Sequence, residues 1–192
     1  PPVLSILGNT SPICQGASVD LLAVPTTYNN ALRLDGNSQS ADLGSWFNYQ
    51  QFTVEFWLRP SAIQSTSGTI IDNFHSSFTG LSWTCAQTGS ITNQYQFICY
   101  TPLGSATATF NLSANTWQHV TLVKSNTALI VYINGNQVAS TAWTLGNIRY
   151  DGTQSLRLGR WAGGTRFWNG QLDEVRIFNA AIPAAQIPVD MN

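Results

Sequence analysis

The segment ALIVYINGNQVAS, residues 128–140, constrains the fold of this chain more than any other. A run of β-branched and aromatic residues ends at Asn134–Gly135, and apolar character resumes at Val138. Asn-Gly between two such runs is typical of a two-residue type I′ turn, because both residues tolerate positive φ angles. The segment therefore predicts an antiparallel β-hairpin.

The same two-residue periodicity recurs along most of the chain, and no segment shows the apolar stripe of an amphipathic helix. In QFTVEFWLRP, Phe, Val, Phe and Leu occupy alternate positions, and large residues fill the positions between them. We therefore expect either a strand covered on both faces or one whose outer face is partly buried.

Short strands separated by turn residues indicate an antiparallel sandwich or barrel. Only IPAAQIP, near the C-terminus, has the composition of a helical turn, and its two prolines keep it short. Besides the hairpin and QFTVEFWLRP, strands are expected at 31–34, 41–43, 69–74, 80–86, 95–101, 106–110, 116–124, 155–159 and 171–178.

Composition bounds the class of partner. Charged residues make up 9% of the chain, against about 25% in typical soluble domains. The formal net charge of −1 offers no field for nucleic acid or an anionic membrane. No apolar run is long enough to span a bilayer, and no signal peptide is present, as in a processed fragment. We expect a soluble, extracellular or cell-surface protein with no nucleic-acid partner and no membrane insertion.

Cysteine usage leaves two alternatives open. Cys85 and Cys99 flank a Gly-Ser turn signal, so pairing of 81–87 with 95–101 would place them roughly opposite each other. A cross-strand disulfide in an oxidising compartment is one outcome, and two separate buried thiols are the other. Cys14 has no evident partner.

Four segments resemble, in order, the motifs of the laminin-G-like, concanavalin A-like jelly-roll family. NALRLDGNSQSADLG resembles the first strand pair, and FTVEFWLRP resembles the strand with the aromatic-Thr-Val-x-x-Trp-x-x-Pro pattern. NTWQHVTLVKSNTALIVYINGNQVAS resembles the Trp-x-His-Val strand and its hairpin, and FWNGQLDEVRIFNAAI resembles the closing segment. The resemblance implies an all-β, antiparallel β-sandwich jelly roll over residues 28–192.

The first residues of the chain differ from the rest. Residues 1–27 are expected to form a separate segment: a linker, an edge strand, or the remnant of a neighbouring module. Their Cys-Gln-Gly before a Val-x-Leu strand resembles the start of an immunoglobulin-like repeat in large secreted bacterial adhesins. On that resemblance, Cys14 has a partner outside this chain or a place in the jelly roll.

The sequence does not match the catalytic pattern of the related glucanases. Those enzymes carry carboxylates on a Glu-x-Asp-x-Glu strand, and this chain has only Glu55 and Glu174. Asp173 precedes Glu174, so on a strand the two side chains point to opposite faces. His119 lies within a strand motif and is expected to pack, while His75 is in a loop with no assigned role. We expect no catalytic residues and no enzymatic activity.

Metal binding is the better expectation. In the resembling family a calcium ion often joins the first strand region to the closing strand, which implies Asp173 as a ligand. Asp35, Gly36 and Asn37 form a turn whose oxygens suit the same hard cation. This Ca²⁺ would be structural. The alternative is that Asp173 only hydrogen-bonds at a β-bulge.

Sugar binding requires exposed aromatic rings with polar donors beside them. Trp161 is the best candidate, because the Gly-rich segment RWAGGTR places it between Arg160 and Arg166. Tyr150 lies in another loop that we expect to be nearby. We take these four residues as the predicted ligand-binding site.

The remaining tryptophans fall into two groups. Trp57, Trp117 and Trp168 lie at motif positions and are expected in the core. Trp46, Trp83 and Trp143 lie outside the family pattern, and the sequence does not place them.

Together these features favour a non-catalytic carbohydrate-binding module of a secreted or cell-surface bacterial protein, with a polysaccharide or glycan as partner. A protein-interaction or structural adhesion module without a sugar site is the first alternative. A glycoside hydrolase or polysaccharide lyase of the same fold is the second.

Overall fold

The structure is a computed structural model that describes residues 31–62, 64, 67–74, 82–89, 93–150 and 152–191. The predictions for residues 1–27, Cys14 and His75 lie outside the described residues. No helix of the described part is both long and apolar enough to cross a bilayer.

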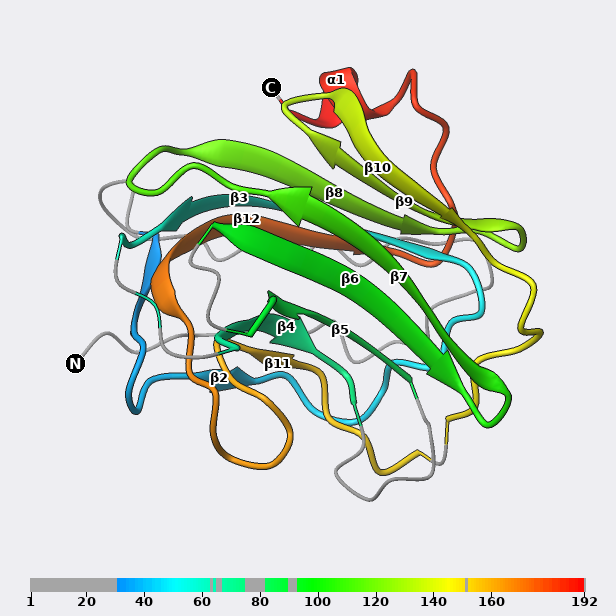
Figure 1. Ribbon diagram of the computed structural model, residues 1–192, viewed down its shortest axis with the longest axis horizontal. Helices are drawn as coiled ribbons and strands as arrows, with labels where there is room; N and C mark the ends of the chain where they lie inside the picture. The colour runs from blue at the N-terminus through cyan, green and yellow to red at the C-terminus, as the bar shows by residue number, and fades with distance from the viewer. Residues whose placement is uncertain are drawn as a thin grey trace, which may run out of the picture.

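Two antiparallel six-stranded sheets pack against each other as a β-sandwich (Figure 1). The first sheet has the order β1-β12-β3-β8-β9-β10, and the second has the order β2-β11-β4-β5-β6-β7. The strands of the first sheet are Leu32–Asp35 (β1), Asn169–Phe178 (β12), Phe52–Pro60 (β3), Gln118–Lys124 (β8), Ala128–Ile133 (β9) and Asn136–Ala142 (β10). Those of the second are Ala41–Asp42 (β2), Arg157–Leu158 (β11), Thr69–Asp72 (β4), Ser82–Gln87 (β5), Gln94–Thr101 (β6) and Gly104–Asn111 (β7). The predicted fold class is confirmed.

The Asn-Gly hairpin forms as its sequence predicts. Asn134 and Gly135 have φ angles of +49° and +76°, the two positive values that a type I′ turn requires. Ile133 and Asn136 pair directly on either side of the turn. Local sequence alone therefore determines the β9–β10 register at the turn.

The core lies between the sheets and is rich in aromatic residues. Phe52 packs against Trp83 and Phe97 with ring centroids 4.9 and 6.1 Å apart. Trp83 and Trp168 are fully buried. Because these rings come from both sheets, they hold the sandwich together and fix the rim from which the loops extend.

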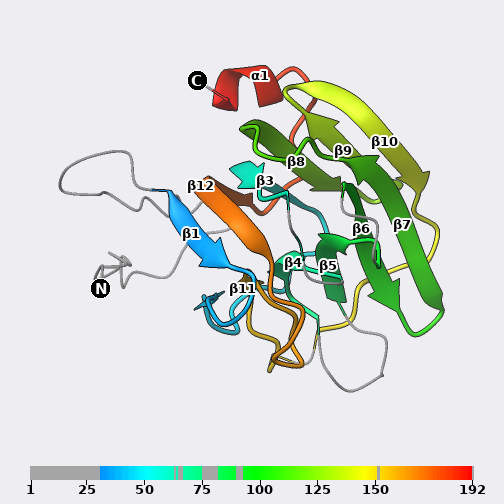
Figure 2. The same ribbon diagram turned by 60° about the vertical axis from the view of Figure 1, so that its left-hand side comes forward.

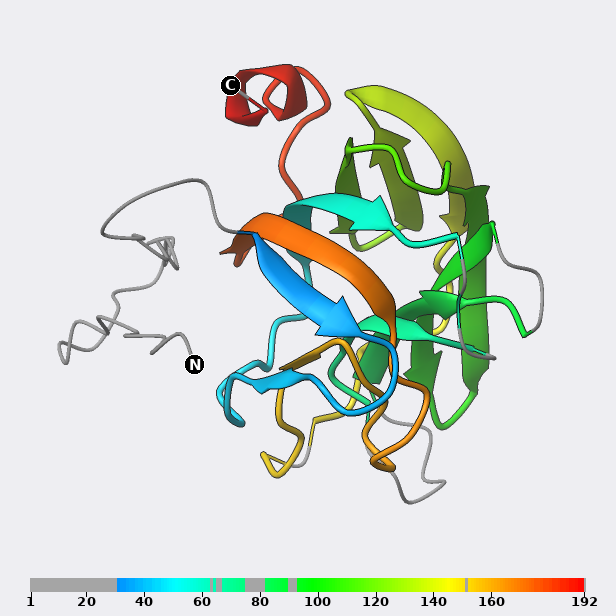
Figure 3. The ribbon, with the colours of Figure 1, turned by 90° about the vertical axis from the view of Figure 1, so that its left-hand side faces the viewer.

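The C-terminal segment covers one end of the outer face of the first sheet. The short helix α1 (Ile187–Asp190) lies beside β8 and β9 in the views of Figures 2 and 3, where Ile187 packs with Val123 and Tyr132. The Thr53 hydroxyl donates to the Ala180 carbonyl. This cover explains why Thr53 and Glu55, on the outer face of β3, are buried, while Trp57 and Arg59 on the same face are partly or fully exposed. The outer face of β3 is therefore partly buried, one of the two arrangements that its sequence predicts.

Two buried ionisable residues lie on that outer face. Glu55 is fully buried, and its Oε1 accepts a hydrogen bond from the Thr121 hydroxyl at 3.2 Å. Burial and the nearby Asp190 raise the pKa of Glu55 to about 7. His119 is 2% exposed, and burial lowers its pKa to about 4. Desolvation therefore favours the neutral form of both side chains.

The structure decides between the two alternatives for Cys85 and Cys99, in favour of separate buried thiols. Strands β5 and β6 pair as expected, but Cys85 lies opposite Phe97, and Cys99 lies opposite Trp83. The cysteines are thus diagonal neighbours, whose Cα atoms lie about 7–8 Å apart in a sheet, too far for a disulfide. Both are free, buried thiols.

Candidate functional site

The loop from Gly159 to Trp168 connects β11 to β12 and extends away from both sheets in Figure 1, and it carries Trp161. The Trp161 N–H donates to the Thr165 carbonyl at 3.1 Å, and the Gly164 N–H donates to the Trp161 carbonyl at 3.0 Å. A Cβ atom at Gly163 would lie 2.1 Å from the Trp161 ring. A side chain at position 163 would clash with the indole in its present position, so Gly163 lets the loop fold back against the ring.

Trp161 and Arg166 form a stacked pair in this loop. The Arg166 guanidinium carbon lies 4.6 Å from the Trp161 ring centroid, within the range of a cation–π interaction. Trp161 is partly exposed and Arg166 is exposed. The Phe74 ring centroid lies 6.4 Å from that of the indole, with the planes inclined by 31°. The indole is therefore held in place while part of it and the guanidinium contact solvent.

Asp72, at the end of β4, anchors the loop from below. Its side chain is fully buried, and its Oδ2 accepts a hydrogen bond from the Ala162 N–H at 3.0 Å. Arg157 Nη1 lies 3.9 Å from the same oxygen. Burial raises the pKa of Asp72 to about 7, against the opposing effects of its hydrogen bonds and Arg157. The loop is therefore hydrogen-bonded to a buried carboxyl group.

Arg160 lies at the base of the same loop. Its Nη2 is 3.9 Å from Asp42 Oδ2, and Arg157 Nε is 3.5 Å from that oxygen. Arg160 is partly exposed. The structure thus brings together Trp161, Arg160 and Arg166.

Tyr150 lies elsewhere. Its hydroxyl donates to the Tyr49 carbonyl at 2.7 Å, and its ring centroid is 6.0 Å from that of Phe47. Burial raises its pKa well above the usual value. Within the described part of the chain, no ring contact or hydrogen bond joins Tyr150 to the Trp161 loop. The prediction that Tyr150 lies in that site has no support in this geometry.

The burial of the tryptophans corrects part of the sequence analysis. Trp168 is buried as predicted, but Trp117 is 38% exposed and Trp57 is partly exposed. Both lie on or beside the outer face of the first sheet, on the side of β3 and β8 that carries Glu55 and His119. The alternation of side chains along a strand predicts that Trp57 and Trp117 lie on the same face as Glu55 and His119. It does not predict how far the C-terminal helix α1 covers that face. Trp46 is 39% exposed, whereas Trp83 and Trp143 are buried.

The predicted calcium ligands do not come together. Asp35 pairs with Asn169 in the β1–β12 ladder, four positions along β12 from Asp173. At about 3.3 Å per residue this is about 13 Å, too far for one ion with ligands at about 2.3–2.6 Å. Asp173 instead accepts a hydrogen bond from the Glu174 N–H at 2.9 Å, beside an irregularity in the β12–β3 register. This geometry matches the alternative that Asp173 hydrogen-bonds at a bulge.

Asp35 has its own local role. Its Oδ1 accepts hydrogen bonds from the backbone N–H groups of Asn37, Ser38 and Gln39, at 2.9, 2.9 and 3.0 Å. These bonds lower the pKa of Asp35 well below its usual value. No group of three or more His, Cys, Asp or Glu side chains with metal-site geometry occurs among the described residues. Calcium binding therefore stays a prediction.

The two glutamates do not form a glycosidase pair. Glu55 is buried beneath the C-terminal segment, and Glu174 is exposed and forms an ion pair with Arg176 at 3.0 Å. A glycosidase requires its two carboxyl groups on either side of an accessible bond. Glu55 and Glu174 do not meet that requirement.

A family model for the concanavalin A-like lectin/glucanases superfamily matches residues 33–188 of this chain. The comparison with curated proteins finds no match. Among solved structures, domain 4 of AbnA, a GH43 extracellular arabinanase from Geobacillus stearothermophilus, in complex with arabinotriose, is similar. It shares 18% identity over 95% of this chain and 84% of that one, with a TM-score of 0.67.

Two structures of the binding domain of botulinum neurotoxin DC are also similar, one in complex with SialylT and one in complex with rat synaptotagmin II. Each shares 18% identity with a TM-score of 0.57 and covers 73% of this chain. The chain spans 35% of the length of those binding domains. At this identity the likeness establishes a shared fold.

Proposed function

The chain belongs to the concanavalin A-like lectin/glucanase superfamily, and we propose that it is a non-catalytic carbohydrate-binding module of a secreted or cell-surface bacterial protein. The observation that carries the proposal is the Trp161–Arg166 pair, an indole and a guanidinium held together at the rim of the sandwich. We propose that Trp161, Arg160 and Arg166 contact the glycan.

The chemistry of this pair suits a sugar. A pyranose or furanose ring offers apolar C–H groups and a rim of hydroxyl groups, which match an indole surface and guanidinium donors respectively. Trp161 is fixed by Arg166, Phe74 and Gly163, so binding orders few side chains. Low ordering entropy favours affinity for a weakly binding ligand.

The similar solved structures suggest which glycans to test first. The arabinanase domain was solved with arabinotriose, and one neurotoxin binding domain was solved with SialylT. Arabinan and sialylated oligosaccharides are therefore the first members of a test panel, followed by xylan, glucan and galactan. The neurotoxin domain solved with synaptotagmin makes a protein ligand the competing function.

Isothermal titration calorimetry with this panel tests the proposal. We expect at least one glycan to bind, and Trp161→Ala to weaken its affinity about tenfold, which corresponds to about 1.4 kcal/mol. Trp117→Ala is the matched control, because Trp117 is 38% exposed and lies outside the loop. It should retain wild-type affinity.

Three results would contradict the proposal. A panel without binding would favour the protein-interaction module. Loss of binding in Trp117→Ala with retention in Trp161→Ala would move the site to the outer face of the first sheet. Release of reducing sugar by the wild-type protein, absent in a matched blank, would establish an enzyme.

A further inference from the structure

A hollow lies at the rim of the sandwich, and none of its lining residues belongs to the Trp161 loop. It has a volume of about 400 Å³. Six residues line it: Lys124, Asn126, Trp143, Thr144, Gly146 and Asn147. We call it the Lys124 pocket.

Lys124 has an unusual position for its residue type. It is the last residue of β8, is 2% exposed, and pairs with Phe52 and Leu129, so its side chain starts from the core-facing side of the strand. It is also the only lysine in the chain. A buried ammonium group normally has an anionic or hydrogen-bonding partner.

No such partner is present among the described residues. The Lys124 Nζ lies 4.6 Å from the ring centroid of Trp143, which gives a cation–π contact. The ammonium group has three N–H donors, and the indole ring provides no oxygen to accept a hydrogen bond from them. The Trp143 indole is fixed by donating its Nε1–H to the Gly146 carbonyl at 2.7 Å. Burial of Cys99 keeps that thiol protonated by raising its pKa, so it supplies no counter-charge. Burial also lowers the pKa of Lys124.

The surroundings of the ammonium group are polar and carry no negative charge. No aspartate or glutamate lines the Lys124 pocket. Asn126, Thr144 and Asn147 are exposed, and their side chains form no hydrogen bond within the described part of the chain. The pocket thus offers a cation and uncommitted amide and hydroxyl groups to an incoming anion.

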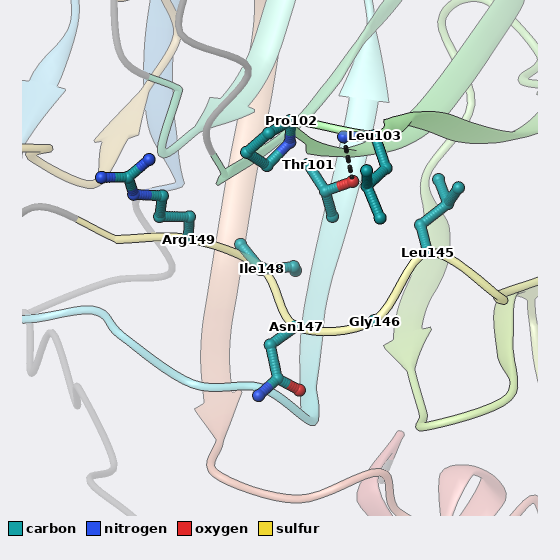
Figure 4. A pocket seen from close by; sticks show the side chains of 8 residues that line it. All are labelled: Thr101, Pro102, Leu103, Leu145, Gly146, Asn147, Ile148 and Arg149. Carbon is teal, nitrogen blue, oxygen red and sulfur yellow. Dashed lines mark hydrogen bonds between the residues drawn. The ribbon is translucent and has the colours of Figure 1, made fainter.

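An adjoining hollow of about 450 Å³ shares Gly146 and Asn147 with the Lys124 pocket (Figure 4). In Figure 4 the turn Thr101–Leu103 lies on one side and residues 145–149 lie on the other. Its walls are mostly apolar, with Leu103 81% exposed, and Arg149 lies at one end. A ligand that fills both hollows has an anionic group joined to a body with an apolar face.

We propose that the Lys124 pocket binds the carboxylate group of an acidic saccharide, whose ring lies against the adjoining apolar hollow. An acidic sugar combines a carboxylate with the apolar C–H face of its ring, as the two hollows require. The identification of the ligand as a saccharide rests on the proposed function. The carboxylate site itself rests on Lys124.

The single lysine makes a direct test available. In protein labelled with ¹³C-lysine, the Lys124 Cε gives one lysine resonance, which can be followed during titration with ligand and with pH. The probes are oligogalacturonate and sialyllactose, each compared with its methyl ester at equal ionic strength, and sodium acetate. We expect an acidic saccharide to shift the resonance and raise the pKa of Lys124, because a bound carboxylate favours the charged amine. We expect the esters to do neither.

Several results would overturn the proposal. An unchanged resonance at high concentrations of both acidic saccharides would do so, and so would equal shifts with acid and ester. A response to acetate without a response to either saccharide would overturn the assignment to a sugar.

Variants separate this inference from the proposed function. Lys124→Met keeps the length of the side chain and removes its charge, and we expect about tenfold weaker binding of the acidic saccharide with unchanged binding of a neutral glycan. Arg33→Met removes an exposed charge from β1 and should change neither. In Trp161→Ala, the response of the Lys124 resonance to the acidic saccharide should persist. Its loss in that variant would instead assign both effects to one site at Trp161.

Discussion

The burial of Glu55 beneath the C-terminal segment makes a quantitative prediction about pH and stability. We expect Glu55→Gln to change the pH dependence of the free energy of unfolding. In the unfolded chain the carboxyl group has its usual pKa of 4.5, and in the folded protein it has a pKa of about 7. Glutamine keeps the size and the hydrogen-bonding capacity toward the Thr121 hydroxyl but does not ionise.

The sign and size follow from linkage. Below pH 4.5 the carboxyl group is protonated in both states, so its contribution to stability is fully present. Between pH 4.5 and 7 the unfolded chain releases the proton while the folded protein retains it, so stability falls as the pH rises. A pKa difference of one corresponds to about 1.4 kcal/mol, so the rise from 4.5 to about 7 gives a loss of about 3 kcal/mol. For a chain of this size that equals a Tm change of about 6–12 °C.

His119 acts in the opposite direction within the same pH range. Its pKa falls from 6.5 to about 4 on folding, so the stability it contributes is present above pH 6.5 and is lost as the pH falls. The wild-type profile therefore combines opposing slopes. Subtracting the wild-type profile from that of Glu55→Gln removes the effect of His119 and leaves that of Glu55.

Urea unfolding followed by tryptophan fluorescence, at several values between pH 4.5 and 8.5, measures the difference. Glu55→Gln should gain about 3 kcal/mol relative to wild type across this range as the pH rises. Glu174→Gln is the matched control, because it changes the only other glutamate, which is exposed. A pH-independent difference between Glu55→Gln and wild type would refute the reasoning.

Other perturbations test the remaining structural assignments. Asp35→Ala should lower the Tm equally in calcium and in EDTA, because the Asp35 carboxylate already accepts three backbone hydrogen bonds; a loss confined to calcium buffer would assign Asp35 to a calcium site. Trp168→Ala should cost about 3–5 kcal/mol in urea unfolding, because the ring is fully buried, and a cost below 1 kcal/mol would contradict that burial. In a variant without Cys14, Cys85 and Cys99 should not react with Ellman's reagent until urea unfolds the protein. A protein mass two units lower than that of the reduced chain would show instead that the two cysteines form a disulfide. Gly135→Ala should cost about 1 kcal/mol because Gly135 has a φ angle of +76°, and wild-type stability would argue against the type I′ turn.

The strands and the hairpin were accessible from the sequence because their signals are local. Alternating apolar residues place side chains on one face of a strand, and Asn134–Gly135 encodes its own turn. The Trp161 loop was found for a similar reason. Arg160 and Arg166 flank Trp161 within one short Gly-rich segment, so few conformations keep them apart.

Lys124 gave no comparable signal. At the end of the strand TWQHVTLVK it resembles an ordinary solvent-exposed lysine. Its burial depends on Trp143, which reaches it from beyond the next two strands. A pattern of residues within one strand does not contain that contact.

The sequence by itself determined the all-β class, the positions of the strands and the Trp161–arginine cluster. Tertiary structure decided the offset of Cys85 from Cys99, the separation of Asp35 from Asp173, and the exposure of Trp117. Strand position depends on side-chain alternation over a few residues. Which residues face one another across strands depends on register, bulges and the packing of distant segments, and these are set only when the two sheets and the C-terminal segment come together.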